Sequence, residues 1–149
     1  MRQLNVFSQD DLRDSSCGDT RDFSRKIKRS SDPLALSPQE IANVLIKYEE
    51  LLKIELGDDL DSLYLFGSVA RGEYSEGSDI DVGVVLEYHP FSGLNSFRRV
   101  TDISSDVSLE FGVHLTDFQV SKEMFETVDR QLYLDIKEEG ILLYKKRGN

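Results

Sequence analysis

Two aspartates separated by a single residue, Asp79 and Asp81, have the type and spacing of a metal-binding pair. They begin residues 79–86, which alternate at first and then become continuously apolar, as expected of a buried β-strand. On a strand, residues i and i+2 lie on the same face, with Cα atoms about 6.5–7 Å apart. Two carboxylates placed in this way repel each other unless a cation lies between them, and Mg²⁺ prefers oxygen ligands. Two such ions roughly 3.5–4 Å apart can stabilise the attacking and leaving oxygens of a phosphoryl or nucleotidyl transfer.

A glycine and a serine, Gly67 and Ser68, follow the strand expected at residues 62–66. Glycine lets a phosphate approach the backbone closely because it has no Cβ. Backbone N–H groups in such a turn, followed by a short helix near residues 69–71, form an anion site, and the Ser68 hydroxyl adds a donor. Each half of this arrangement is common by itself, since Gly-Ser occurs in ordinary turns and Asp-x-Asp at solvated strand edges.

Together the two halves form one long pattern, G-S-x-A-R-G-x₅-S-D-I-D, which runs from Gly67 to Asp81. The pattern resembles the minimal nucleotidyltransferases (MNT proteins) of the DNA-polymerase-β-like superfamily, and the similarity extends over about residues 33–144. The resemblance implies an α/β (α+β) fold, with a small mixed β-sheet flanked by helices. It also implies binding of Mg-NTP and transfer of a nucleoside monophosphate, most often AMP from ATP, to an acceptor hydroxyl.

The resemblance assigns the metal and phosphate contacts. Asp79 and Asp81 would be the catalytic carboxylates and the Mg²⁺ ligands, and Gly67 and Ser68 would hold the β- and γ-phosphates. The acceptor hydroxyl would attack the α-phosphorus, and pyrophosphate would leave.

Two further residues of the pattern, Arg71 and Ser78, are candidate nucleotide-binding residues. Arg71 can contact phosphate, or it can form a structural ion pair with a nearby acid, of which Glu73, Glu76 and Asp79 are available. Ser78 is alternatively a local hydrogen-bonding or capping residue.

The sequence departs from the family on the next core strand, where superfamily members supply a third carboxylate. The aligned residue is His114, within the stretch of residues 110–118 that matches the family's strand. Asp117 lies three residues later, so strand alternation sends it to the opposite face, and Gly112 invites a break between Glu110 and His114. A neutral imidazole accepts a proton near pH 7, so His114 is a candidate catalytic base. The alternative is a packed or surface histidine in a site that has lost full activity.

Two functions therefore stay open. The first is an Mg²⁺-dependent nucleotidyltransferase that acts on a protein hydroxyl, since we expect no extra helical domain of the kind that holds an antibiotic. The second is a catalytically weak or inactive binding module that neutralises a partner protein by direct contact. Proteins of this family often pair with a HEPN-type ribonuclease toxin, so the resemblance implies a toxin–antitoxin partner.

Hydrophobic periodicity predicts the elements that position these residues. Ser37-Pro38-Gln39-Glu40 has the capping box and the proline of a helix start, and Gly57 is a helix stop. The expected order is α-β-(α)-β-α-β-α-β: a helix to residue 57, a strand at 62–66, a short helix at 69–71, a strand at 79–86, a helix from 94, a strand at 112–120, helical sequence at 121–139 broken near 128–129, and a strand at 141–144.

Composition suits one domain of 149 residues, of which 39% are hydrophobic. No apolar run approaches the roughly 20 residues that span a bilayer, and aspartates near the N-terminus argue against a secretory signal. One cysteine, Cys17, excludes an internal disulfide framework and a multi-cysteine zinc site. We therefore expect a cytoplasmic protein.

Charge divides the chain near residue 33. The net charge of −10 consists of +1 over residues 1–32 and −11 over residues 33–149. This acidic balance argues against direct nucleic-acid binding, although bridging metal ions still permit a polyphosphate ligand. Residues 1–32 have few large apolar side chains, so we expect a flexible N-terminal tail and a nucleotidyltransferase-like domain at 33–149.

Two charged clusters lie outside the pattern. Residues 25–29 are basic and form either a solvated linker or an electrostatic handle for RNA or an acidic partner. Asp58, Asp59 and Asp61 are expected in a solvated turn, because the ligand spacing of a calcium loop is absent. His89, beside Pro90 in an expected loop, is incidental to the site.

Overall fold

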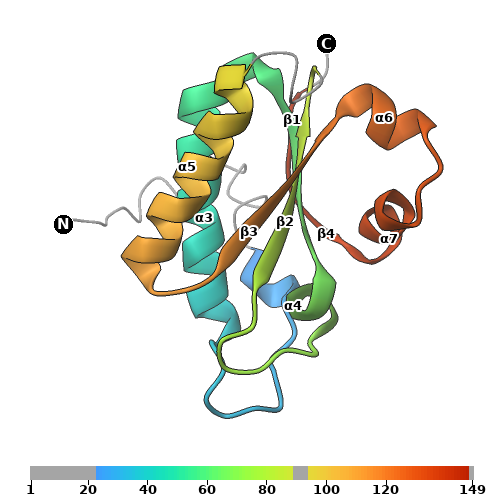
Figure 1. Ribbon diagram of the computed structural model, residues 1–149. Coiled ribbons are helices and arrows are strands. Elements are labelled where there is room, and N and C mark those ends of the chain that lie inside the picture. Colours follow the sequence, from blue (N-terminus) through green and yellow to red (C-terminus); the bar gives the residue numbers. More distant parts are fainter. Residues whose placement is uncertain (1–22, 89–93, 148–149) are drawn as a thin grey trace.

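The computed structural model describes residues 23–88 and 94–147. Its centre is a four-stranded mixed sheet with strand order β3-β2-β1-β4 (Figure 1). β1 pairs antiparallel with β2 and β4, whereas β3 runs parallel to β2. The strands are β1 (Leu60–Phe66), β2 (Ile80–Leu86), β3 (Leu115–Ser121) and β4 (Ile141–Lys145). The predicted α+β class, with a small mixed sheet flanked by helices, is confirmed.

Helices cover both faces of this sheet (Figure 1). α3 and α5 pack on one face, and α6 and α7 lie on the other. The helices are η1 (Phe23–Lys26), α3 (Pro38–Leu56), η2 (Gly57–Asp59), α4 (Gly67–Arg71), α5 (Leu94–Phe111), α6 (Lys122–Thr127) and α7 (Gln131–Glu139). The predicted element order is confirmed, including the break between α6 and α7. Within the described ranges, no helix is both long and apolar enough to cross a membrane.

α3 begins where the capping box predicts. The Ser37 hydroxyl accepts a hydrogen bond from the Glu40 backbone N–H at 3.1 Å, and Glu40 Oε1 accepts one from the Ser37 N–H at 2.8 Å. Pro38 occupies the first turn, and Gly57 ends the helix with a φ of +54°. These local signals fix both ends of the helix that supports the sheet.

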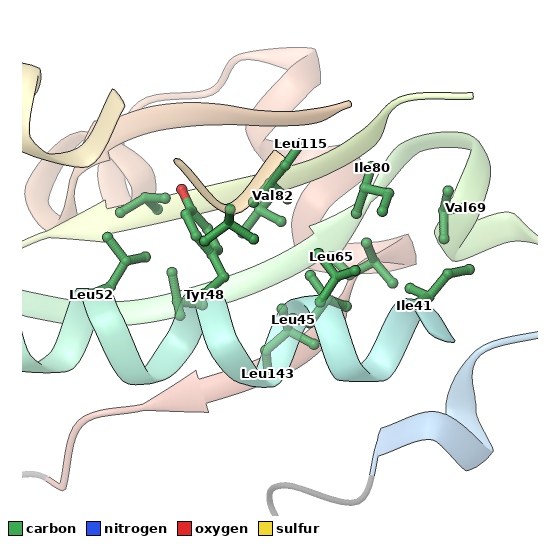
Figure 2. Close-up of a cluster of buried hydrophobic side chains, with 14 of the residues drawn as sticks. Ile41, Leu45, Tyr48, Leu52, Leu65, Val69, Ile80, Val82, Leu115 and Leu143 are labelled. Carbon is green, nitrogen blue, oxygen red and sulfur yellow. The ribbon is translucent and has the colours of Figure 1, made fainter. Parts of the chain in front are cut away.

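The larger apolar core lies between α3, α5 and the sheet (Figure 2). Within it, the Tyr48 hydroxyl lies 2.7 Å from Ser104 Oγ and joins α3 to α5. Figure 2 labels ten of the buried side chains that meet there: Ile41, Leu45, Tyr48, Leu52, Leu65, Val69, Ile80, Val82, Leu115 and Leu143. A smaller cluster on the other face includes Phe125, Tyr133 and Ile136. The sheet is therefore held from both sides.

The third strand begins later than the sequence predicts. α5 continues through Glu110, and Gly112, with a φ of +67°, directly follows it. The Ser108 hydroxyl then accepts a hydrogen bond from the Leu115 N–H at 2.9 Å. The strand expected at residues 112–120 is thus Leu115–Ser121, and Glu110 is a helical residue.

Asp61 differs from the expected solvated turn, although Asp58 and Asp59 are exposed in η2. Asp61 is buried in β1, where Lys145 Nζ donates to its two carboxylate oxygens at 3.1 and 2.9 Å. Lys122 Nζ lies 3.8 Å from the same carboxylate. The two ammonium groups compensate the buried charge. The pairing of Asp61 with Lys145 spans 84 residues, so the local sequence does not reveal it.

The end of the expected N-terminal tail packs on the domain. Phe23 and Ile27 are buried in the larger core cluster, against α3. The Ser30 hydroxyl bonds to the Tyr74 carbonyl, and the Tyr74 hydroxyl donates to the carbonyl of Lys28 at 3.1 Å. Two large apolar residues in a single turn are enough to anchor a segment that lacks sustained periodicity. The structure does not describe residues 1–22, which include Cys17, or His89. A flexible tail over residues 1–22 therefore stays a prediction.

Replacing Phe23 with alanine tests whether this segment belongs to the folded domain. We expect Phe23→Ala to lower the free energy of unfolding by about 3 kcal/mol, because it empties a buried site. Urea denaturation measures the change. The control Ile54→Ala truncates a side chain that is 80% exposed and should change the value by less than about 0.5 kcal/mol. Equal stability of Phe23→Ala and wild type would contradict the packing.

Candidate active site

Asp81 lies against the first residue of α4. The pairing of β1 with β2 sets Asp81 opposite Phe66, directly before Gly67. A Cβ added to Gly67 would lie 2.5 Å from Asp81 Oδ2, so a side chain at this position would require the Asp81 carboxylate to move. Gly67 also has a φ of +80°, which favours glycine. The register and the glycine together bring the expected phosphate turn into contact with the expected metal ligand.

Asp79 and Asp81 interact electrostatically at the start of β2. Asp79 is exposed immediately before the strand, and Asp81 is half-buried within it. Burial raises the pKa of the Asp81 carboxyl, and the negative charge of Asp79 raises it further, whereas the Arg71 guanidinium lowers it. A cation bound between the two carboxylates would remove this conflict. The structure thus brings the predicted pair together, and their role as metal ligands stays a prediction.

The donor set fits an Mg²⁺ ion that arrives with a nucleotide. Across residues 23–88 and 94–147, no group of three or more His, Cys, Asp or Glu side chains is placed to hold a metal. Asp79 and Asp81 therefore supply only two carboxylates. Mg²⁺ usually takes one or two carboxylates and completes its shell with water and substrate phosphates.

Backbone amides at the start of α4 are available to an anion. The first N–H groups of a helix have no partner within the helix, and the N-cap residue Phe66 provides no side-chain cap. α4 ends after five residues at Gly72, whose φ is +76°. The turn begins with Gly67 and Ser68, as the sequence predicts, and their contact with β- and γ-phosphates stays a prediction.

Arg71 forms the structural ion pair that was one of its two expected roles. Its Nε donates to Glu73 Oε1 at 2.9 Å, and its Nη1 lies 3.8 Å from Glu139 Oε1. The Glu73 carboxylate raises the pKa of the guanidinium through this hydrogen bond. The positive charge of Arg71 also lowers the pKa of the Asp81 carboxyl, so Arg71 interacts electrostatically with the carboxylate pair. A direct phosphate contact by Arg71 stays a prediction.

Ser78 has the local hydrogen-bonding role that was its alternative. Its hydroxyl accepts a hydrogen bond from the Ser75 N–H at 2.9 Å, and its own N–H donates to the Ser75 carbonyl at 3.1 Å. The resulting turn shapes the loop immediately before Asp79. A nucleotide contact by Ser78 stays a prediction.

His114 lies beside the start of β2, at the level of Asp79. Its carbonyl accepts a hydrogen bond from the Ile80 N–H at 2.7 Å, and Ile80 pairs with Leu115 in the parallel ladder. The His114 side chain is exposed, so it is not a packed core residue. Asp117 bonds instead to Gln119 Nε2 at 2.9 Å, and Gln119 also donates to the Phe97 carbonyl in α5. Asp117 therefore lies on the α5 side of the sheet, as strand alternation predicts.

Several residues near the site were not expected from the sequence. Thr116 pairs with Asp81 in the β2–β3 ladder, a neighbour that only the register reveals. Asp32 accepts hydrogen bonds from the backbone N–H of Glu76 at 2.8 Å and of Leu34 at 3.0 Å, and both bonds lower the pKa of its carboxyl. Asp32 thus ties the N-terminal segment to the loop that carries Asp79. No short-range pattern signals a contact across 44 residues.

A pocket of about 360 Å³ opens next to this loop. Three segments form it: the residues before α3, the loop before Asp79, and the turn between α5 and β3. Its lining consists of Leu34, Leu36, Glu76, Gly77, Ser78, Gly112, Val113 and His114. Ser78 in this lining immediately precedes Asp79 in the sequence, and neither Asp79 nor Asp81 lines the pocket.

Comparison with known proteins gives a consistent family. The nucleotidyltransferase domain family matches residues 45–143. Two proteins of Methanocaldococcus jannaschii, “Putative protein adenylyltransferase MJ0604” and “MJ0141” of the same description, are 31% identical over 99 residues and 34% identical over 74 residues. These alignments cover 66% and 50% of this chain, and 92% and 73% of the relatives.

Solved structures with a similar arrangement include a toxin-antitoxin complex with AMP-PNP and a minimal nucleotidyltransferase. The toxin-antitoxin complex has a TM-score of 0.48 and 18% identity, and the alignment covers 70% of this chain and 73% of the chain in the complex. The second has a TM-score of 0.46 and 21% identity, with coverage of 66% and 91%.

Replacing Gly67 with alanine tests the close approach at this turn. We expect Gly67→Ala to weaken Mg-ATP binding about 10–100-fold, because the new Cβ displaces the Asp81 carboxylate. Calorimetric titration measures the affinity. Gly57→Ala is the matched control: its φ is also positive, at +54°, and nothing lies within 4 Å of the added Cβ. Both variants should lose about 1 kcal/mol of stability, and wild-type affinity in Gly67→Ala would exclude the turn from the site.

Proposed function

The chain belongs to the nucleotidyltransferase domain family of transferase enzymes, and from that premise we propose that it transfers AMP from ATP to a hydroxyl on a protein. The contact between Asp81 and Gly67 carries this proposal, because it joins an expected phosphate turn to a pair of acidic residues. The names of two relatives as protein adenylyltransferases support AMP as the group and protein as the acceptor.

Each group of the site has a distinct task in the proposed reaction. Asp79 and Asp81 would hold Mg²⁺, which would supply positive charge to the reacting phosphate oxygens. The first amides of α4, with the Ser68 hydroxyl, bind the β- and γ-phosphates and orient the pyrophosphate as the leaving group. Gly67, which has no Cβ, lets the Asp81 carboxylate lie against the start of α4. His114 accepts the proton of the acceptor hydroxyl in place of the third carboxylate.

A second function, neutralisation of a partner protein by contact alone, is favoured by one observation. The position of the third carboxylate holds His114, and the described ranges contain no three-residue metal cluster. A weakened site with an acidic surface would still bind a basic partner, such as a ribonuclease toxin of the HEPN type. The double variant Asp79→Asn/Asp81→Asn separates the two functions, because contact alone would let it neutralise such a partner fully.

Label transfer tests the proposed activity. Purified protein is incubated with Mg²⁺, [α-³²P]ATP and an extract of its source cells. We expect a label on protein that resists nuclease and is lost on protease treatment, whereas [γ-³²P]ATP should label nothing in the same way because the γ-phosphate leaves. Asp79→Asn/Asp81→Asn should reduce transfer at least about 100-fold, because the metal contributes several kcal/mol to the transition state.

Asp58→Asn/Asp59→Asn is the matched control, since it also removes two neighbouring carboxylates, here in exposed η2. It should label at the wild-type rate. Full transfer by the Asp79/Asp81 variant would overturn the metal assignment, and no transfer by the wild type would overturn the proposed activity.

A further inference from the structure

The connecting loop between α4 and β2, residues 72–79, joins the proposed phosphate turn to the carboxylate pair. It leaves α4 at Gly72 and ends at Asp79, directly before β2. The structure describes every residue of this loop; none belongs to a helix or strand, and Tyr74 alone is buried. Because Asp79 is exposed, its position depends on its backbone more than on side-chain packing. The strand fixes that backbone on one side, and the connecting loop fixes it on the other.

Hydrogen bonds join the buried Tyr74 to an N-terminal segment, residues 28–36, which we call the strap. The Tyr74 hydroxyl donates to the carbonyl of Lys28 at 3.1 Å and to that of Leu36 at 3.2 Å. In the other direction, the Ser30 hydroxyl donates to the Tyr74 carbonyl. The loop residue is therefore held by the strap through both its side chain and its backbone.

Two further contacts extend this attachment along the connecting loop. The Glu76 N–H donates to Asp32 Oδ2 at 2.8 Å. At the start of the loop, a Cβ added to Gly72 would lie 2.8 Å from Lys28 Cβ, so the two backbones approach closely. Just before the strap, Phe23 is buried in the larger core. The strap is thus attached to the core at one end and to the loop along its length.

The strap lies outside the part of the chain that matches the family, which is residues 45–143. A pair of carboxylates binds a cation well only while both hold their positions. If a site is competent for only part of the time, its apparent affinity falls by that fraction. Residues that hold metal ligands in place typically change metal affinity about 10–100-fold. A contact that restrains the backbone next to Asp79 therefore bears on binding without touching the ligand.

We propose that the strap positions Asp79 for Mg-ATP binding, with Tyr74 and Ser30 as the positioning residues, an inference that rests on the proposed function. Both residues act through the connecting loop and belong to neither the carboxylate pair nor the phosphate turn. Loss of either hydroxyl lets the loop, and with it Asp79, leave the arrangement that binds the cation. The affinity for Mg-ATP then falls although the domain stays folded.

Two substitutions that change no charge test the strap. Tyr74→Phe and Ser30→Ala each remove one hydroxyl, so electrostatic attraction of the cation stays the same. We expect each to weaken Mg-ATP binding about tenfold in a calorimetric titration well below the melting temperature. Tyr48→Phe and Ser104→Ala are the matched controls, because they remove the two hydroxyls that meet at 2.7 Å between α3 and α5. All four variants should melt a few degrees lower, since each loses a hydrogen bond, and the controls should keep the wild-type affinity within about twofold.

Amide hydrogen exchange in the ligand-free protein measures the connecting loop directly. The backbone N–H groups of Ser75, Glu76 and Ser78 each donate a hydrogen bond. In both strap variants these amides should exchange about fivefold faster than in the wild type, because a lost hydrogen bond has roughly that effect on local opening. The two core controls should leave their exchange unchanged.

The outcomes separate the strap from the proposed function. Wild-type Mg-ATP affinity in both strap variants would overturn the positioning role, and so would an equal loss of affinity in the two core controls. A loss of affinity with unchanged loop exchange would also overturn it, because the effect would not pass through the loop. Absence of Mg-ATP binding by the wild type would instead overturn the proposed function, and with it any role of the strap in that site.

Discussion

The repulsion between two carboxylates at the start of β2 is the constraint on which the site depends. Asp81 is half-buried and next to Asp79, so both burial and a like charge raise the pKa of its carboxyl. Gly67 lies against the same carboxylate, and a Cβ added there would be 2.5 Å from Asp81 Oδ2. We expect this arrangement to cost stability in the free protein, and a cation bound with phosphate ligands between the two carboxylates would offset that cost. Functional sites commonly carry this kind of local conflict.

The rest of the fold holds the two carboxylates close to each other and Asp81 close to Gly67. Packing on both faces of the sheet prevents β1 and β2 from sliding apart, so their register keeps Asp81 at Gly67. Asp32 and Tyr74 tie the N-terminal segment to the loop before Asp79. The same segment supplies one wall of the adjacent pocket. Long-range contacts therefore position a site whose chemistry lies in a short stretch of sequence.

Local signals made most of the fold predictable. The capping box at Ser37 fixed a helix start, and alternation with apolar runs indicated the strands. The grouping of Asp79 and Asp81 with the glycine turn followed from strand periodicity and the long motif. Contacts between distant residues were not predictable: Phe23 is buried although its segment has no periodicity, and Asp61 is neutralised by lysines far along the chain. The start of β3 was misplaced because helix propensity and strand propensity compete around Gly112, and the structure places that residue directly after α5.

Thermal unfolding of the wild type and Asp81→Asn, each with and without Mg-ATP, tests the carboxylate conflict most directly. The raised pKa of Asp81 means that the fold loses stability as pH rises through and above its ordinary value of 3.8. At neutral pH without ligand, Asp81→Asn should therefore unfold a few degrees higher than the wild type. Mg-ATP should raise the midpoint of the wild type and leave that of Asp81→Asn unchanged. A lower midpoint for ligand-free Asp81→Asn, or equal stabilisation of both proteins by Mg-ATP, would contradict a carboxylate pair built to receive a metal and a triphosphate.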